Sequence, residues 1–364
     1  MKKSYFLMVA AATMFAACSQ SDVLNEVQVQ EEAQAIGFST YSGKVTRAAE
    51  NNGNATATSG MESHHGDFLV WGYKNTYDEY VFKGERVSSD GAGNWTYVNP
   101  KFWDKGALSY QFYAAAPNSD KWNLSSNGTA QDDDYFFINN FSLVGRSLTQ
   151  PTRQNSFADV KDYDSDLMIA SPCEIDRDAF GQTVELKFNH ILSRLNVTVN
   201  KGSNIAGATL NITSFKVYKL KNAGNFNENA DLEGATLANG TTKRWTPAAT
   251  EYEIAGNAMN DVKNDINNQY IFQSLVIPQV ASSEAIDRNG SSVETAPYFT
   301  IEYTINNEPF SATYNLATAF GQSGLALCEG YENTLNLTID AETIVFDATV
   351  YQWTNKFTNS FYIK

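Results

Sequence analysis

The feature that most constrains the fold of this chain is the alternation of apolar and polar residues over short segments. In residues 184–188 every second side chain is apolar, and four later segments repeat the pattern: 195–199, 299–305, 335–339 and 344–350. Such alternation buries one face of a strand and leaves the other in water, as in antiparallel sheets. Turn-forming pairs such as Asp90-Gly91 separate the segments. The sequence therefore predicts an all-β fold.

Further strands and a few irregularities can be placed from the local pattern. The alternating apolar residues change from even-numbered to odd-numbered positions between Ile212 and Phe215, which predicts a bulge near Ser214. Short helices are expected only over 255–267 and 316–320. In the first half of the chain, strands are predicted over these segments, the second and third of them as neighbours: 36–45, 68–73, 79–82, 95–98 and 108–113.

Length and composition set the domain organisation and exclude one class of partner. The chain has 364 residues, of which 42% are hydrophobic and 13% aromatic, enough for two sizeable cores. Its 19 tyrosines suit strands better than helices. We therefore predict two antiparallel β-sandwich domains, over 48–182 and 183–364. The formal charge of −15 disfavours nucleic acid as a partner.

The first residues are typical of an export signal rather than of a folded element. Lys2 and Lys3 precede an apolar run that ends at Ala17 and is too short to span a membrane. Cys18 follows two small residues, as in a lipoprotein signal, so 1–17 is predicted to be removed and Cys18 to carry acyl chains such as palmitate. Ser19 in place of aspartate favours the outer membrane. Acyl chains would hold the protein there durably.

Signals of catalysis or of metal binding are weak. The chain contains no phosphate-binding loop, nucleophile elbow or His-Glu-x-x-His motif. Asp162, Asp164 and Asp166 begin like a calcium loop, but Leu167 and Cys173 occupy the positions that require glycine and glutamate. A solvated turn is the favoured interpretation. No cofactor, metal site or catalytic residue is predicted.

The histidines and the remaining cysteines support the same conclusion. His64 and His65 are not spaced from any cysteine as zinc ligands would be. His190 is expected to be a hydrogen-bonded residue at a strand end rather than a base. Cys173 and Cys328 are expected to be buried free thiols, although an oxidising compartment would also permit a disulfide between them.

Several segments, taken in order, resemble one protein family. They are 95–103, 110–117, 186–195, 276–279, 330–339 and 350–353, and together with the lipoprotein signal they are similar to the Bacteroidia fimbrillin family. The resemblance covers nearly all of the chain after the signal. It implies two transthyretin-like β-sandwich domains and a fimbrial role as stalk, anchor or tip subunit.

The resemblance also implies a route of assembly. The lipidated propeptide 18–47 would be cut by a trypsin-like, arginine-specific protease between Arg47 and Ala48. Cleavage would remove a first strand that carries Ile36, Phe38 and Val45, and would leave a groove. A strand from another subunit would then fill the groove, and the tail of this chain offers the apolar side chains for it: Phe357, Phe361 and Ile363. A native strand of the second domain is an equally open reading of that tail.

The resemblance leads us to expect a fimbrial subunit or fimbria-associated adhesin and no enzyme. Its partners would be other fimbrial subunits, the outer membrane through lipid, the processing protease and a host or bacterial surface receptor. The expected location is a surface-exposed fimbrium at the outer membrane. One alternative is a surface lipoprotein that captures glycans, motivated by six tryptophans that mostly should fill cores. Another is a glycosidase, which would need paired carboxylates across a cleft.

Overall fold

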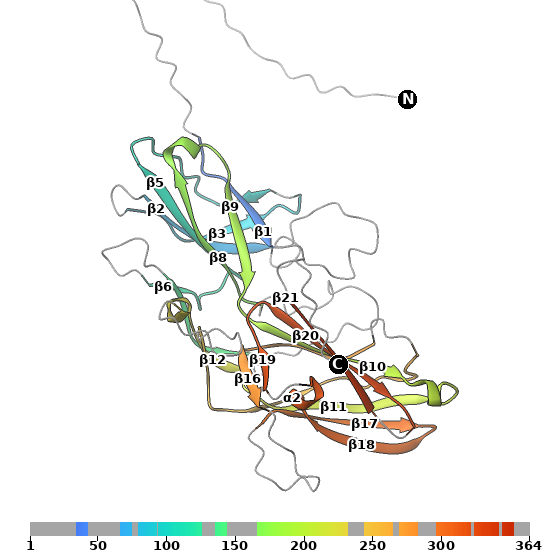
Figure 1. Ribbon diagram of the computed structural model, residues 1–364. Helices are drawn as coiled ribbons and strands as arrows, with labels where there is room; N and C mark the ends of the chain where they lie inside the picture. The colour runs from blue at the N-terminus through green and yellow to red at the C-terminus, as the bar shows by residue number, and fades with distance from the viewer. Residues whose placement is uncertain are drawn as a thin grey trace, which may run out of the picture. The chain divides into compact units, whose positions relative to one another are not determined.

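Strands follow one another through nearly all of the chain that the computed structural model describes (Figure 1). All described residues belong to the compact unit that begins at Gln34. The described residues are 34–42, 66–74, 79–92, 94–125, 135–143, 166–231, 244–264, 269–282, 296–321, 324–341 and 344–352. The all-β prediction is confirmed.

The largest sheet has seven strands in the order β1-β9-β8-β5-β2-β3-β4. The predicted neighbours 68–73 and 79–82 lie in β2 and β3, which pair antiparallel. Every pairing in this sheet is antiparallel except that of β1 with β9, which is parallel. The strand bounds are Phe38–Ser42 for β1, Asp67–Lys74 for β2, Glu79–Ser89 for β3, Trp95–Thr96 for β4, Ser109–Ala116 for β5, Met168–Asp176 for β8 and Val184–His190 for β9.

A four-stranded sheet combines segments from both sides of the predicted junction between 182 and 183. Its order is β13-β12-β7-β6. Sheet pairing also crosses that junction at β9, which begins at Val184 yet joins β1 and β8. Aromatic packing holds the mixed sheet together, because the Trp245 ring lies 5.3 Å from Phe226 and 5.7 Å from Phe141. The bounds are Asn123–Ser125 for β6, Tyr135–Ser142 for β7, Ala223–Asn227 for β12 and Trp245–Pro247 for β13.

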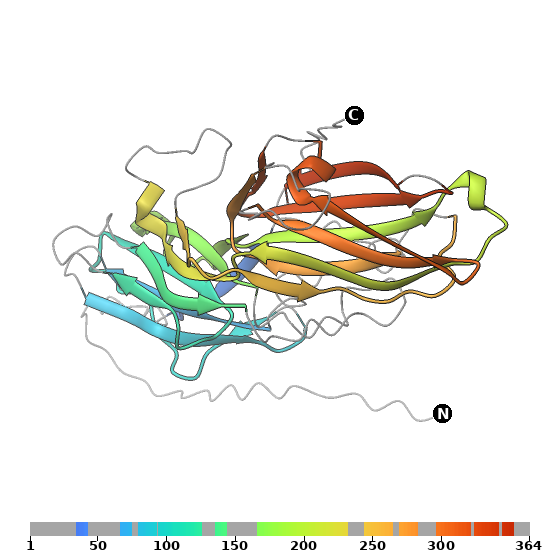
Figure 2. The same cartoon turned by 90° about the horizontal axis from the view of Figure 1, so that it is seen from below.

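Two more four-stranded sheets share one apolar core in the second half of the chain (Figure 2). Their orders are β15-β10-β20-β21 and β14-β11-β17-β18, and β10 pairs parallel with β20. A two-stranded sheet, β16-β19, adds to this core. The bounds are Ser193–Lys201 for β10, Leu210–Leu220 for β11, Tyr252–Ala255 for β14, Tyr270–Val276 for β15, Gln279–Ser282 for β16, Tyr298–Ile305 for β17, Glu308–Asn315 for β18, Gly324–Leu327 for β19, Tyr331–Ile339 for β20 and Ile344–Gln352 for β21.

The local expectations have mixed outcomes. The register between β11 and β17 shifts between Ile212 and Ser214, so the predicted bulge is confirmed. The helix expected at 316–320 is present as α2, Leu316–Ala319, which is capped by the Asn315 side chain. The described helices include none that is long and apolar enough to cross a membrane. Short 3-10 turns η5, η6 and η7 occur at Arg177–Ala179, Ser203–Ile205 and Glu228–Asp231.

The helix expected at 255–267 is wrong for the described part of that segment. After β14 the backbone bonds to neighbouring strands instead of to itself: Gly256 N donates to Phe215 O at 2.7 Å and Asn257 N to Ile271 O at 2.7 Å. A Cβ on Gly256 would lie 2.4 Å from Ile271 O, so the glycine permits this close approach. Strand neighbours far away in sequence have overridden the local preference.

Trp245 offers a test of the mixed sheet. Its indole Nε1 donates to the buried Ile191 carbonyl at 2.6 Å. Trp245→Phe should lower the free energy of unfolding by about 1–3 kcal/mol, because the carbonyl loses its partner inside a core. Urea unfolding of the purified chain measures this, with Thr246→Ala at the exposed neighbouring position as the control. Equal stability of the two variants would contradict the role assigned to the indole.

Candidate assembly site around the first strand

β1 forms one edge of the seven-stranded sheet. It pairs with β9 over five residues, from Phe38 opposite Val184 to Ser42 opposite Phe188. Figure 1 shows β1 in blue along the length of β9. The pairing satisfies the backbone groups of β9 that would otherwise form an open edge and invite association.

The side chain of Phe38 fills a pocket made of aromatic rings. Its ring centroid lies 5.3 Å from Phe82, 5.8 Å from Phe112, 5.9 Å from Tyr97 and 6.5 Å from Phe68. The ring is 5% exposed. Edge-to-face ring pairs of this kind add about 0.5–1.5 kcal/mol each beyond their buried area. β1 therefore contributes a central part of the core of this sheet.

Ile36, just before β1, is buried in the same core and held by its backbone. Its N–H donates to Lys101 O at 2.8 Å, and its carbonyl accepts from the Tyr97 hydroxyl at 2.7 Å. Trp103 N donates to Gln34 O at 3.1 Å. Burial raises the pKa of Tyr97, which keeps its hydroxyl protonated as a donor. Residues 97–107, the clamp loop, thus hold residues 34–37, the lead-in segment that precedes β1.

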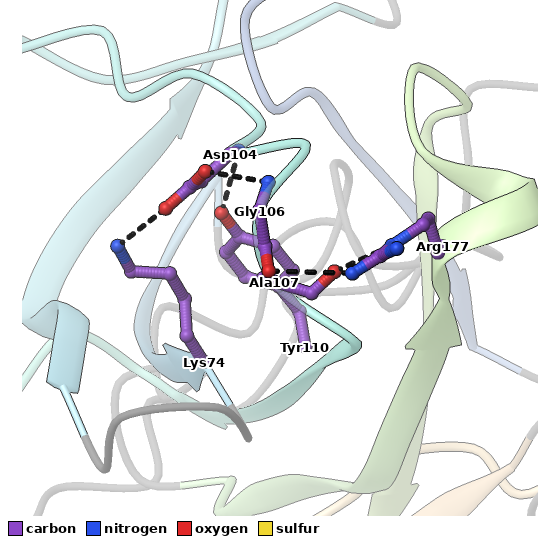
Figure 3. A network of polar contacts seen from close by, with 6 residues as sticks. All are labelled: Lys74, Asp104, Gly106, Ala107, Tyr110 and Arg177. Atoms are coloured by element: carbon purple, nitrogen blue, oxygen red, sulfur yellow. Dashed lines mark hydrogen bonds and ion pairs between the residues drawn. The ribbon is translucent and has the colours of Figure 1, made fainter.

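The clamp loop is itself fixed by a polar network from distant elements (Figure 3). Lys74 at the end of β2 forms a salt bridge with Asp104, with Nζ 3.0 Å from Oδ2. The Asp104 N–H donates to the Tyr110 hydroxyl at 2.8 Å. Arg177 Nε donates to Ala107 O at 2.8 Å and its Nη2 to Gly106 O at 3.3 Å. The network positions the loop to receive the lead-in segment.

Asp104 makes this network dependent on pH. A hydrogen bond from Gly106 N at 2.8 Å, and then one from Lys74, lower the pKa of the Asp104 carboxyl. A lowered pKa means that these contacts stabilise the fold above the usual aspartate value of about 3.9 and are lost as the pH falls through the folded pKa. We expect the Gly106 amide resonance to titrate with a midpoint below that value.

The matched variants separate this carboxyl from its neighbours. Asp104→Asn should abolish the titration of the Gly106 amide. Asp90→Asn should leave it unchanged, because the pKa of Asp90 is also lowered but by Asn94 and Ala92 in another turn. A Gly106 titration that persists in Asp104→Asn would show that another group is responsible.

The structure places some of the predicted site residues and not others. Ile36 and Phe38 are both buried in the core behind β1. The remaining predicted site residues lie outside the described part of the chain, so lipidation, processing and strand donation stay predictions: Cys18, Val45, Arg47, Ala48, Phe357, Phe361 and Ile363. Sequence reasoning missed the clamp loop, since no local signal connects Asp104 with Lys74 or Arg177.

His190 and the cysteines have structural roles. His190 lies at the end of β9, with Nδ1 3.1 Å from Asp166 Oδ1, so the expectation of a hydrogen-bonded residue is confirmed. Cys173 and Cys328 are free thiols as expected, but they are half-buried rather than fully buried. Burial, with Glu329 as a second cause, raises the pKa of Cys328 to about 11. The solvated turn expected for the third aspartate is wrong, because Asp166 is 2% exposed and lies against His190. Asp162 and Asp164 lie outside the described residues, within which no group of three or more His, Cys, Asp or Glu is arranged to hold a metal ion.

The described tryptophans give no support to sugar stacking. Each is at most 9% exposed, and each belongs to an apolar core: Trp71, Trp95, Trp103, Trp122 and Trp245. Trp353 lies beyond the described residues. Among the described residues, therefore, no tryptophan is exposed for the sugar stacking that a glycan-capture role would use.

Comparison with solved structures identifies similar chains of low sequence identity. A candidate cell adhesion protein from Bacteroides uniformis is 15% identical, with a TM-score of 0.49 over 90% of this chain and 100% of its own. A fimbrial protein from Bacteroides vulgatus is 16% identical, with a TM-score of 0.49 over 88% and 100%. The tip fimbrial protein Mfa3 from Porphyromonas gingivalis is 8% identical, with a TM-score of 0.38 over 80% and 95%.

The assignment to a family rests on sequence. No curated protein matches the chain. The model of the fimbrillin-like family matches residues 46–353, which is most of the 364-residue sequence. The match begins after β1 and ends before the apolar tail, so the roles of those two segments depend on this chain's own residues. The protein belongs to the fimbrillin-like family.

Proposed function

We propose that this protein is a structural and adhesive fimbrial subunit that is exported as a lipoprotein and polymerises by exchange of its first strand. The observation that carries the proposal is the position of β1: an edge strand, buried in an aromatic pocket, that ends at Ser42, five residues before Arg47. A cut after Arg47 separates β1 from the rest of the chain. The strand is then held by noncovalent contacts alone.

Loss of β1 opens a slot with two kinds of unsatisfied surface. The backbone of β9 loses five paired residues, and Lys101 and Trp103 lose their bonds to the lead-in segment. The four rings around Phe38 lose the ring that fills their pocket. An apolar slot beside an open strand edge is the surface that β-augmentation uses, with main-chain bonds for affinity and pockets for specificity.

The tail of a second subunit supplies a matching strand in this proposal. Burial of Phe357, Phe361 and Ile363 is worth about 5–9 kcal/mol before ordering costs are subtracted. Each subunit then accepts a strand at its first sheet and donates one from its C-terminal end. Such a head-to-tail contact does not close on itself and therefore produces a filament.

The anchoring and the layout belong to the same proposal. Acyl chains on Cys18 would hold the precursor at the outer membrane until cleavage after Arg47 releases it from its lipid. The domains would be transthyretin-like sandwiches over 48–182 and 183–364, with sheet pairing across the junction as described above. A surface-exposed fimbrium built this way would act by binding other subunits and a surface receptor rather than by catalysis.

A direct assay of assembly tests this function. The purified chain is digested briefly with an arginine-specific protease and run unheated on a denaturing gel. We expect a ladder that collapses to a monomer on heating, and an N-terminus at Ala48 in the ladder bands. A stable monomer cut at Ala48 that never forms a ladder would contradict strand exchange.

A further inference from the structure

We propose that the incoming strand enters the slot of β1 in the reverse direction, antiparallel to β9, with Phe361 in the pocket of Phe38 and Ile363 in the place of Ile36. This inference rests on the proposed strand exchange and specifies its partner: the tail of a second copy of the chain, in one direction and one register.

The native strand presents its side chains to the slot in a defined order. Positions 36, 38 and 40 lie on one face, and they read isoleucine, phenylalanine and threonine. Ile36 and Phe38 are 1% and 5% exposed, whereas Thr40 is only half-buried. The slot therefore requires a medium apolar side chain, then an aromatic ring, and then accepts a polar group.

The tail has the same order of side chains when it is read backwards. Ile363, Phe361 and Asn359 follow one another at alternate positions. They reproduce the order of the native strand, with isoleucine on isoleucine, phenylalanine on phenylalanine, and asparagine at the half-buried position of Thr40. The polar break in the tail thus falls where the slot already accepts a polar side chain.

The native, parallel direction fits worse in every register. The parallel registers that keep Phe357 or Phe361 in the ring pocket place Asn355 or Asn359 at the buried position of Ile36. If Phe361 takes the place of Ile36, then Ile363 enters the four-ring pocket, and the two sizes are exchanged. If Phe357 takes the place of Ile36, then Asn359 enters that pocket. A size exchange in a packed core costs free energy, and an unpartnered amide among aromatic rings costs more.

Tyr362 falls at the position of Gly37 in the reverse register. A side chain there is acceptable only if the backbone and the space allow it. A Cβ on Gly37 meets nothing closer than Thr183 Oγ1 at 3.8 Å, an ordinary contact, and the residue is half-buried rather than enclosed. The slot therefore has room for tyrosine at this position.

The backbone pairing also favours the reverse direction. β1 pairs with β9 in parallel over five residues, whereas its lead-in makes a single antiparallel bridge, Ala35 with Phe102. A reversed strand exchanges these two geometries. Antiparallel pairing is slightly more stable per residue than parallel pairing. The five residues paired with β9 therefore gain more stability than the single bridge loses. Exchange of the native strand for the tail is then favourable in the backbone as well.

Disulfide trapping between two labelled copies tests the direction. In the reverse register Ser360 lies opposite the exposed Glu185, whereas Lys364 does so in the parallel register that places Phe361 at Ile36. The parallel register that places Phe357 at Ile36 also brings Ser360 to Glu185, and the exchange of Phe361 and Ile363 described below separates it from the reverse register, because in that parallel register neither residue enters the place of Ile36 or of Phe38. One acceptor, Glu185→Cys, is therefore mixed after cleavage with either of two donors, Ser360→Cys or Lys364→Cys, all with Cys173 and Cys328 replaced by serine. Facing strand residues lie within the distance that a disulfide spans.

We expect the Ser360→Cys donor to give about tenfold more cross-linked dimer than the Lys364→Cys donor, the ratio that corresponds to about 1.4 kcal/mol. A ladder in which Lys364→Cys is the better donor would overturn the reverse direction and leave strand exchange intact. If no variant formed a ladder, strand exchange itself would be refuted. A chain carrying both Glu185→Cys and Ser360→Cys that closes into a disulfide-linked monomer would overturn the assignment to a second copy.

A variant of unchanged composition provides an independent readout. Phe361→Ile combined with Ile363→Phe keeps the hydrophobicity of the tail and exchanges the two sizes. In the reverse register this places phenylalanine in the space of Ile36, so ladder formation should slow by about tenfold. If the exchanged tail assembles as fast as the parent or faster, the slot accepts the strand in the parallel direction and the inference fails.

Discussion

Arg47→Ala should remain monomeric under digestion with an arginine-specific protease that converts the parent chain into a heat-sensitive ladder. The physical reason is competition within one molecule. As long as β1 is covalently attached, it faces its slot at a local concentration in the millimolar range, far above that of any donor tail in solution. Cutting one bond removes this advantage, and we expect the yield of ladder to differ by at least about a hundredfold between the two chains.

The choice of protease provides the control. Arg47→Lys should behave like Arg47→Ala with the arginine-specific protease and should recover the ladder with trypsin, which also cuts after lysine. Both variants should unfold at the parent's urea concentration before digestion, because the substitution leaves β1 in place. Efficient assembly of undigested Arg47→Ala would refute release of the strand by cleavage at this position.

Phe38→Ala should destabilise the uncleaved chain by about 3–5 kcal/mol. The ring is 5% exposed and contacts four other rings, so its removal leaves a cavity in the core that its neighbours can fill only in part. Phe38→Leu should fall between the parent and alanine, because it keeps apolar volume and loses the edge-to-face contacts. Urea unfolding of the purified precursor measures all three.

The destabilisation by Phe38→Ala should be present only before the chain is cleaved. Ser39→Ala, on the other face of β1, should change the free energy of unfolding by less than about 0.5 kcal/mol. After cleavage and assembly, Phe38→Ala and the parent should be equally stable, since β1 no longer belongs to the subunit. A difference between them that persists in the ladder would mean that β1 stays in its slot, and strand replacement would be wrong.

The proposed removal of β1 would also explain how such a subunit avoids premature association. The precursor satisfies the edge of β9 from within and keeps its aromatic pocket filled, and its formal charge of −15 adds repulsion between copies. In the proposed mechanism, cleavage would change all of this at one place without touching the second core. Assembly would then be coupled to a protease rather than to the concentration of subunits.

The sequence by itself determined the buried face of several strands. β10 is an exception, because Asn196 and Thr198 on its polar face are buried as well. The alternation at 184–188 predicts one buried face, and Val184, Leu186 and Phe188 are all at most 1% exposed. The parity change before Phe215 predicts the bulge, and 316–320 predicts α2. These features can be read locally because side chains alternate between the two faces of a strand, and a helix has its own period.

Only the tertiary structure decided which strands are partners and in which direction they run. The backbone groups of one strand can pair with any other strand, so nothing in residues 36–42 indicates that β1 runs parallel to β9 or that Lys101 receives Ile36. The same holds for β12, which joins β7, and for Gly256, whose bonds go to Phe215 rather than along a helix. Side-chain pattern specifies a buried face, whereas the choice of partner depends on the packing of segments that lie far apart in the chain.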